Sequence, residues 1–232
     1  MAINIISGNI FTTRCQTLVN TINCVGVMGA GLALECRLRY PDMHQKYIEL
    51  CQEKQIDIGL LWLYKSDDRW ILNFPTKKDW KYPSKTEYLR AGLAKFVSSY
   101  EARGVESIAF PLLGADKGGI HHEESLEIML EYLENVPIDI EIYRYDKMAK
   151  DDLYDKTKDW LLSQDLEHVA SLSKLRKNYI LKVIEAMHSP NVVQLNQLAL
   201  IDGIGIKTLE KIFILAQNSA LSESGTFQTR LI

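Results

Sequence analysis

Short apolar runs alternate with amphipathic stretches through about the first 145 residues of the chain. The runs that predict β-strands are Ile3–Ile6, Thr17–Ile22, Leu60–Tyr64, Trp70–Phe74, Ser107–Pro111 and Ile138–Tyr143. Between them, apolar residues recur at helical spacing in Gly31–Arg39, Met43–Lys54, Thr86–Arg103 and Glu123–Asn135. Strands separated by helices of this length predict an α/β fold in which helices cover both faces of a sheet.

The pattern changes at about Leu153, after which no strand-like run remains. The helical stretches predicted there are Leu153–Gln164, Leu166–His188, Val193–Leu200 and Thr208–Gln217, with a break at Ser189-Pro190. We therefore predict an α/β domain over residues 1–147 and a small all-α domain over residues 148–232.

The charge of the chain argues against a general attraction to nucleic acid or to anionic membranes. The formal net charge is −3 at pH 7, and the tail from Asp146 onward is neutral, with 11 basic and 11 acidic residues. Binding of DNA or of a nucleotide must then come from local geometry, such as backbone amides or a few placed cations. No apolar run approaches the ~20 residues that span a membrane, so we expect no membrane association.

The cysteines give no sign of a metal site or of disulfides. Cys15, Cys24, Cys36 and Cys51 form no Cys-x-x-Cys pair and no cluster with histidine at zinc spacing. The first residues, MAINIISGNI, alternate like a strand and do not resemble a secretory signal. We therefore expect a cytoplasmic protein with reduced, mostly buried cysteines.

A glycine-rich turn follows the second predicted strand, in LVNTINCVGVMGAGLALECRLRY from Leu18 to Tyr40. Gly26, Gly29 and Gly31 permit positive φ and a close backbone approach. Free amides at the start of the next helix, together with the helix dipole, favour anionic oxygens. The spacing matches neither GxGxxG nor GxxxxGK[ST], and a glycine turn of this kind is also typical of a plain tight connection.

A second glycine-rich segment, PLLGADKGGI from Pro111 to Ile120, also follows a buried strand and precedes a helix. Two loops at the carboxyl ends of sheet strands can flank one crevice and hold a diphosphate between them. A single loop of this kind is weak evidence for phosphate binding, because glycine loops also serve as tight turns. The pair, in this placement, predicts phosphate binding.

These motifs together resemble the macrodomain family. VNTIN ends a strand in paired asparagines, MGAGLA and PLLGADKGGI form two diphosphate loops, and SGNIF resembles the turn that reads adenine in that family. Within macrodomains, QTLVNTINCVGVMGAGLALECRLRYPDM and WILNFPTKKDW are most similar to the DarG antitoxins, which remove ADP-ribose from DNA. The resemblance covers roughly Met1 to Tyr145 and implies a three-layer α/β/α fold with a mixed sheet.

The resemblance also implies an ADP-ribose site. Its residues would be Asn9, Ile10, Asn20, Asn23, Gly29, Ala30, Gly31, Thr76, Gly114, Ala115, Asp116, Lys117, Gly118, Gly119 and Ile120. Asn9 is a departure, because the family usually has Asp there. A carboxylate can only accept from the adenine amino group, whereas an Asn side chain accepts and also donates. Asn is also a common turn residue, which leaves a structural role open for Asn9 and Asn23.

Lys77 is the residue expected to carry catalysis. It stands in NFPTKKDWK just after the strand Trp70–Phe74, and the matching lysine is essential for cleavage in the DarG-like and terminal ADP-ribose glycohydrolase branches. A lysine beside C1″ can attack the anomeric carbon through a Schiff base, or hold a positive charge against the departing group. Attack requires a lowered pKa, to which burial or the neighbouring Lys78 would contribute. The alternative is a pair of solvated loop lysines.

The second catalytic group is less defined by the sequence. Asn23 would lie beside the proximal ribose, and Asp116 is the carboxylate of the second loop. The terminal glycohydrolases carry an Asp that matches the region of Gly118, where the DarG-like chains and this one have Gly. Asp116 is therefore equally consistent with a substitute acid, a ribose ligand or a turn residue. His121 and His122 are expected to face solvent.

LALIDGIGIKTLEKIFILA, over residues 198–216, resembles a helix–hairpin–helix motif. In that motif the hairpin, here with Gly203 and Gly205, points backbone amides at a DNA phosphate without reading sequence, and Lys207 would add positive charge. A helix pair closed by a glycine turn and used only for packing is the alternative. The neutral tail predicts weak DNA affinity.

The first functional hypothesis is a DarG-like ADP-ribosyl glycohydrolase that releases ADP-ribose from modified DNA and neutralises a DNA-modifying toxin partner. The second keeps the enzyme and changes the substrate to O-acetyl-ADP-ribose or ADP-ribosylated protein. The third is a non-catalytic ADP-ribose reader that uses its tail to bind DNA or a partner. The chemistry needs no metal and no cofactor.

Overall fold

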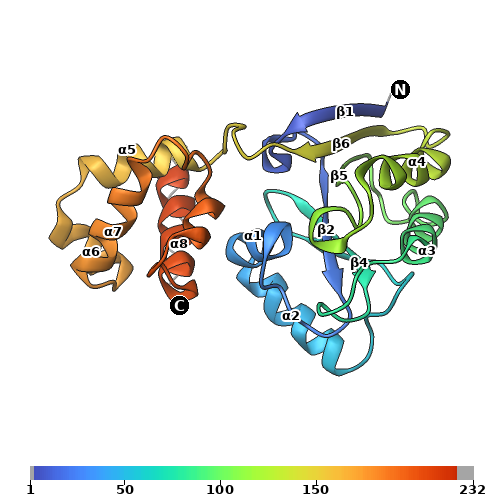
Figure 1. The fold of residues 1–232 in the computed structure, drawn as a ribbon, viewed down its shortest axis with the longest axis horizontal. Coiled ribbons are helices and arrows are strands. Elements are labelled where there is room, and N and C mark those ends of the chain that lie inside the picture. The colour runs from blue at the N-terminus through green and yellow to red at the C-terminus, as the bar shows by residue number, and fades with distance from the viewer. Residues whose placement is uncertain (1–2, 224–232) are drawn as a thin grey trace. The chain divides into compact units, whose positions relative to one another are not determined.

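The computed structural model describes residues 3–223 of the chain. They form two compact units that divide between Asp146 and Lys147, and each unit is described by itself. In Figure 1 the first runs from blue to yellow-green and the second from yellow to red.

The first unit is built on a six-stranded sheet of order β1-β6-β5-β2-β4-β3. The strands are β1 (Ile3–Gly8), β2 (Thr17–Asn23), β3 (Trp62–Lys65), β4 (Trp70–Lys77), β5 (Ser107–Pro111) and β6 (Asp139–Tyr145). β3 pairs antiparallel with β4, and the other pairings are parallel. The predicted α/β fold with a mixed sheet is confirmed.

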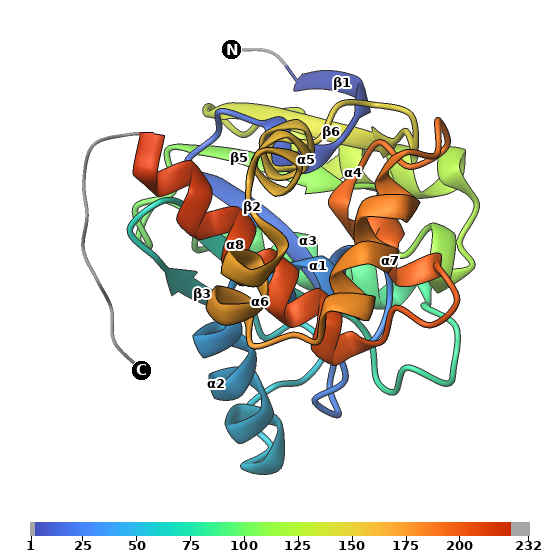
Figure 2. The same cartoon turned by 90° about the vertical axis from the view of Figure 1, so that its left-hand side faces the viewer.

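Alternation along the central strands gives the sheet two apolar faces. Leu18 and Ile71 belong to the core on one face, whereas Val19 and Leu72, the next residues along, belong to the core on the other. The first face is covered by α1 (Gly31–Arg39) and α2 (Pro41–Gln52), and the second by α3 (Thr86–Val97) and α4 (His122–Leu133) (Figure 1 and Figure 2). Both faces are thus covered, as the alternation of strands and helices predicted.

One close contact fixes α3 against the sheet. Gly92 of α3 is buried over Phe74 of β4, and a Cβ built on Gly92 would lie 2.2 Å from Cζ of the Phe74 ring. Phe74 is itself fully buried and lies three residues before Lys77 in the same strand. The absence of a side chain at Gly92 therefore sets how closely the helix approaches the strand that carries Lys77.

The predicted end of β4 at Phe74 is wrong. The strand continues to Lys77, because β4 remains paired with β2 as far as that residue. Its pairing with β3 on the other side extends only to Asn73, which lies opposite Trp62. Pro75 thus lies in the strand and not in a turn after it, where β4 has a partner strand on one side only, as is usual for proline in a sheet. Lys77 is consequently held by strand pairing.

The second unit is helical. Its elements are α5 (Tyr154–Ser163), α6 (Leu166–Ser173), α7 (Lys177–Met187), the 3-10 helix η3 (Leu195–Leu200) and α8 (Ile206–Glu223). The single helix predicted over Leu166–His188 is wrong, because the chain turns at Lys174, whose φ is 54°. The Ser173 hydroxyl donates to the Val169 carbonyl and accepts from the Leu175 amide, which closes α6 without a glycine or a proline.

Two turns of this unit share one geometry. Lys174 before α7 and Gly203 before α8 both have left-handed backbone, with φ of 54° and 78°. Two residues later, the carbonyls of Arg176 and Gly205 each accept hydrogen bonds from two amides in the first turn of the next helix. The two segments form a structural repeat that their residue types do not show.

Three further observations concern the helices, the possible metal ligands and the cysteines of the described residues. None of their helices is long and apolar enough to cross a bilayer. They contain no group of three His, Cys, Asp or Glu side chains that could hold a metal ion. The four cysteines are free thiols.

Candidate functional site

A cavity of about 560 Å³ opens where β2, β4 and β5 end at one edge of the sheet. Its lining consists of residues 21–23, 27, 29–33, 76, 77, 80, 111, 112 and 114–118. Both glycine-rich segments contribute to it, although they are far apart in the sequence. Parallel strands carry their carboxyl ends to the same edge, so the loops that follow β2 and β5 meet there.

The first wall is the loop between β2 and α1. Gly31 begins α1 with φ of 56°, and no atom lies within 4 Å of a Cβ built on it. The N-cap of the helix, Ala30, has no side chain that could satisfy the first amides. Those amides and the positive end of the helix dipole line the cavity, which is the arrangement that binds anionic oxygens.

Asn23 holds this loop in shape. Its Oδ1 accepts from the amides of Val25 and Val27 at 3.0 and 3.3 Å, and its Nδ2 donates to the Val27 carbonyl at 2.5 Å. The buried Tyr47 hydroxyl of α2 donates to the Asn23 carbonyl at 2.7 Å. The Asn23 side chain lines the cavity, but its hydrogen bonds serve the loop.

The second wall is the loop after β5, which contains the 3-10 helix η2 (Asp116–Gly118). Gly114 has φ of 65°, and a Cβ there would lie 2.8 Å from Ile120 and 3.0 Å from Leu89. Only glycine fits this turn, because both the conformation and the space exclude a side chain. The Gly118 carbonyl accepts from the Ser84 amide at 2.8 Å, which joins the loop to the segment before α3.

Lys77 lies between the two walls. Its ammonium donates to the Lys117 carbonyl at 2.5 Å, so the side chain reaches from the end of β4 to the second loop. Burial lowers the pKa of Lys77 below the usual value of a lysine. Cys24 fixes the backbone here, since its amide donates to the Lys78 carbonyl at 3.1 Å and its thiol to the Lys77 carbonyl at 3.3 Å.

The side chain of Lys78 lies in a different environment from that of Lys77. Its side chain is about half exposed and forms an ion pair with Asp57, which raises the pKa of Lys78. Lys78 is absent from the cavity lining. The two adjacent lysines therefore have different environments, and the pKa is lowered for the one in the cavity and raised for the one outside it.

Asp116 has a partner that the sequence did not indicate. His122, the first residue of α4, lies with Nε2 3.0 Å from Oδ1 of Asp116, and both side chains are well exposed. Asp116 also has φ of 43°, an uncommon conformation for a residue with a side chain. The carboxylate at the rim of the cavity is thus paired with an imidazole from the start of the next helix.

Comparison with known proteins identifies the family. The Macro domain model matches residues 19–129. A DNA ADP-ribosyl glycohydrolase of Thermus aquaticus is 40% identical over 140 residues, which are 57% of this chain and 39% of that protein. The structure titled macrodomain of Thermus aquaticus DarG is 37% identical, with a TM-score of 0.59, and the match covers 62% of this chain and 98% of that one.

The chain belongs to the macrodomain family. A second relative, from Thermosipho africanus, is named a DNA ADP-ribosyl transferase-DNA ADP-ribosyl glycohydrolase fusion protein and is 31% identical over 160 residues, 61% of this chain and 41% of that protein. The structure titled Thermosipho africanus DarTG in complex with ADP-ribose is 32% identical, with a TM-score of 0.59, and the match covers 62% of this chain and 41% of that one. This chain spans about two fifths of the length of the relatives it matches.

The macrodomain cavity brings together most of the predicted site residues. Its lining includes Asn23, Gly29, Ala30, Gly31, Thr76, Lys77, Gly114, Ala115, Asp116, Lys117 and Gly118. Five other predicted residues, Asn9, Ile10, Asn20, Gly119 and Ile120, are not part of this lining. Asn20 is fully buried and donates to Asn73 Oδ1 at 2.9 Å, so it belongs to the core below the site.

Asn9 lies at the start of the 3-10 helix η1 (Ile10–Thr12) of the macrodomain. Its Oδ1 accepts from the Phe11 amide at 3.0 Å, and this bond fixes the orientation of the side-chain amide. Its Nδ2 is buried and has no hydrogen-bond partner. A buried donor without a partner is costly unless a ligand supplies the acceptor.

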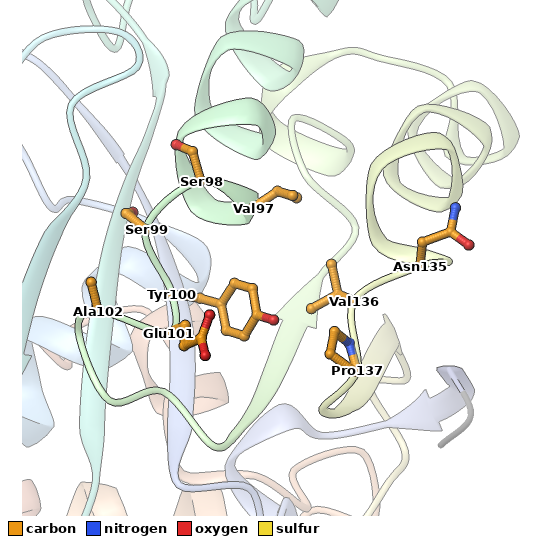
Figure 3. A pocket seen from close by; sticks show the side chains of 9 residues that line it. All are labelled: Val97, Ser98, Ser99, Tyr100, Glu101, Ala102, Asn135, Val136 and Pro137. Atoms are coloured by element: carbon orange, nitrogen blue, oxygen red, sulfur yellow. The ribbon is translucent and has the colours of Figure 1, made fainter.

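A second hollow, of about 280 Å³, lies elsewhere on the macrodomain (Figure 3). It is lined by residues 97–102, after α3 ends at Val97 and not at the predicted Arg103, and by residues 135–137 after α4. None of the predicted site residues lines it. Two features of the first site were not singled out from the sequence, Trp80 in its lining and the contact of His122 with Asp116, because neither residue forms part of a glycine-rich motif.

Proposed function

We propose that this protein is an ADP-ribosyl glycohydrolase that removes ADP-ribose from modified DNA. The observation that carries the proposal is the position of the Lys77 amine, between two glycine-rich loops of one cavity. The names of the relatives from Thermus aquaticus and Thermosipho africanus, which describe DNA ADP-ribosyl glycohydrolases, support the same activity.

In the proposed complex, the diphosphate lies between the first amides of α1 and the second loop. The proximal ribose then lies towards Lys77, and the adenine lies towards Asn9. Nδ2 of Asn9, which is buried without a hydrogen-bond partner, would donate to a ring nitrogen of the base once binding exposes it, whereas an Asp at this position could only accept from the amino group.

Replacing Asn9 tests this adenine contact. We expect Asn9→Ala to weaken ADP-ribose binding by about 5- to 10-fold, the value of one hydrogen bond in a buried site. Titration calorimetry with ADP-ribose measures the effect, and ribose 5-phosphate, which lacks adenine, serves as the control ligand. An unchanged affinity for ADP-ribose would remove Asn9 from the site.

For the chemical step, the lone pair of Lys77 Nζ attacks C1″ of the ADP-ribosyl group. The bond from C1″ to the base breaks, and its electrons and a proton go to the base. Loss of the amine proton and opening of the sugar ring give an imine, and water then adds to release ADP-ribose and the lysine. We assign the exchange of protons with the leaving group to Asp116, which lines the cavity and contacts His122. Asn23 holds the first loop in place and makes no proton transfer.

The pH dependence distinguishes this role from a purely electrostatic one. Only the neutral amine attacks, and the pKa of Lys77 is lowered by burial. We therefore expect the single-turnover rate to rise with pH and to level off below about 10.4, the ordinary lysine value. A rate that falls over the same range would mean that Lys77 acts as a cation.

A paired assay separates the three functional hypotheses. The protein is incubated with an ADP-ribosylated oligonucleotide, with an ADP-ribosylated protein and with O-acetyl-ADP-ribose, and free ADP-ribose is measured. Release from the oligonucleotide alone supports the proposal. Release only from the ADP-ribosylated protein or only from O-acetyl-ADP-ribose would contradict it and support the second hypothesis. ADP-ribose binding without release from any of them identifies a reader.

The name of the Thermosipho africanus relative joins a DNA ADP-ribosyl transferase to a glycohydrolase. We accordingly propose that a transferase that modifies DNA is the partner of this chain, as toxin to antitoxin. Co-expression with such a toxin should restore bacterial growth, and the Lys77→Ala variant should not restore it.

The helical unit is proposed to contact DNA through the turn before α8. Gly203, Gly205 and Lys207 are exposed there, and Nζ of Lys182 lies 2.2 Å from the position of a Cβ on Gly203. Backbone amides and two lysines suit a phosphate and carry no sequence preference. Lys207→Glu should weaken binding of duplex DNA several-fold in a filter-binding assay, with the same loss for unrelated sequences. An unchanged affinity would leave the hairpin a packing element.

A further inference from the structure

A short segment beside the cavity exposes two aromatic side chains. Trp80 and Tyr82 follow β4 and have 53% and 66% of their surface exposed. The other three tryptophans, Trp62, Trp70 and Trp160, are only partly exposed. Large aromatic side chains left in water beside a binding cavity are typical of recognition surfaces.

The backbone under these rings is fixed. The Lys81 amide donates to Oδ1 of Asp79 at 3.0 Å, and the Tyr82 amide donates to the Asp79 carbonyl at 3.2 Å. The Ser84 amide then donates to Gly118 of the second glycine-rich loop. The two rings are therefore presented by an ordered turn that is tied to the cavity wall.

The charge of this segment is opposite to that of the chain. Residues 77–85 contain four lysines and one aspartate, a net charge of +3, whereas the whole chain has −3. Lys78 is neutralised by Asp57, which leaves Lys81 and Lys85 exposed on the segment itself. Lys117 of the second loop adds a further exposed cation at the cavity rim.

We propose that Trp80 and Tyr82 form a stacking platform for the bases of single-stranded nucleic acid that leads into the cavity. This inference rests on the proposed function, because Lys77 marks the end of the cavity where the nucleobase leaves. Trp80 lines the same cavity as Lys77, and in the proposed complex the leaving base would stack on its ring and the adjacent base on Tyr82. Stacked aromatic rings combined with lysines bind a strand without reading its sequence.

Fluorescence tests the platform without any need for hydrolysis. An unmodified single-stranded oligonucleotide of about ten nucleotides should quench the tryptophan emission, because Trp80 is the most exposed of the four indoles. The quenching should disappear in Trp80→Phe, although the Phe ring should preserve affinity within about threefold as measured by anisotropy of a labelled strand. Quenching that persists in Trp80→Phe would overturn the proposal.

Kinetics test the second ring. Tyr82 is outside the cavity lining, so Tyr82→Ala should leave cleavage of an ADP-ribosylated mononucleoside unchanged and raise the KM for an ADP-ribosylated oligonucleotide about 5- to 100-fold. Tyr82→Phe, which keeps the ring, should restore the KM. An equal KM for Tyr82→Ala and the unaltered protein on the oligonucleotide would refute the platform while leaving the glycohydrolase intact. A loss seen with an ADP-ribosylated peptide but not with the oligonucleotide would replace nucleic acid by protein as the occupant.

If no substrate is cleaved at all, the proposed function fails by itself. The fluorescence and anisotropy measurements still decide whether a strand binds at Trp80. The two proposals therefore fail in distinguishable ways.

Discussion

Lys77→Ala should abolish release of ADP-ribose, with a loss of about 10³-fold or more in the single-turnover rate. The reason is that Lys77 is the one lysine side chain of the cavity lining that reaches across to the opposite loop. ADP-ribose affinity should change by less than about tenfold, because in the proposed complex backbone amides of both loops hold the diphosphate. Rapid-quench assays and calorimetry measure the two quantities.

Two matched variants sharpen this result. Lys78→Ala removes the adjacent lysine, which is paired with Asp57 outside the cavity, and should retain activity within about threefold. Lys77→Arg keeps the positive charge but removes the nucleophile, and should be as inactive as Lys77→Ala. Full activity in Lys77→Ala would refute the mechanism, and substantial activity in Lys77→Arg would assign Lys77 an electrostatic role.

Gly92→Ala should lower the free energy of unfolding by about 1–3 kcal/mol. Alanine has the higher helix propensity by about 1 kcal/mol, so helix formation alone predicts the opposite sign. The new Cβ, however, would lie 2.2 Å from the ring of the fully buried Phe74, and a rigid aromatic ring in a packed core cannot move aside without strain. Urea denaturation measures the change.

The control for helix propensity is Ala94, which is exposed on the same helix. Ala94→Gly should cost about 1 kcal/mol, the propensity difference by itself. Adding Phe74→Leu to Gly92→Ala should recover part of the lost stability, because the smaller side chain frees space for the new methyl group. A higher stability for Gly92→Ala would show that the ring gives way at little cost.

The hydrophobic pattern predicted the elements of the first unit well because buried strands and amphipathic helices have different periods. It missed the break at Lys174, since that turn is closed by the Ser173 hydroxyl and contains neither glycine nor proline. It also ended β4 too early, because proline usually stops a strand and only the sheet order shows that Pro75 has a partner strand on one side.

The residues of the candidate site also divide into those identified from the sequence and those identified only from the structure. The glycine-rich segments were identified from local motifs, because anion binding by amides needs particular residues at particular spacings. Lys77 was identified from the resemblance of its segment to the macrodomain family. The pairing of Asp116 with His122, and the burial of Asn20 in the core, depend on neighbours that no local pattern encodes. Trp80 likewise lies in the cavity lining on a turn that is joined to the second loop by the hydrogen bond from Ser84 to Gly118, a contact that no local pattern encodes.

The sequence by itself determined the fold class and identified the two glycine-rich loops, and its resemblance to macrodomains indicated Lys77. It could do so because glycine conformation, strand alternation and helix periodicity are properties of short stretches. The tertiary structure alone decided that the two loops meet in one cavity, which asparagine is core, and which aromatic rings remain in water. Those outcomes depend on burial and on hydrogen bonds between segments that are distant in the chain, and their energies exist only after the sheet has assembled.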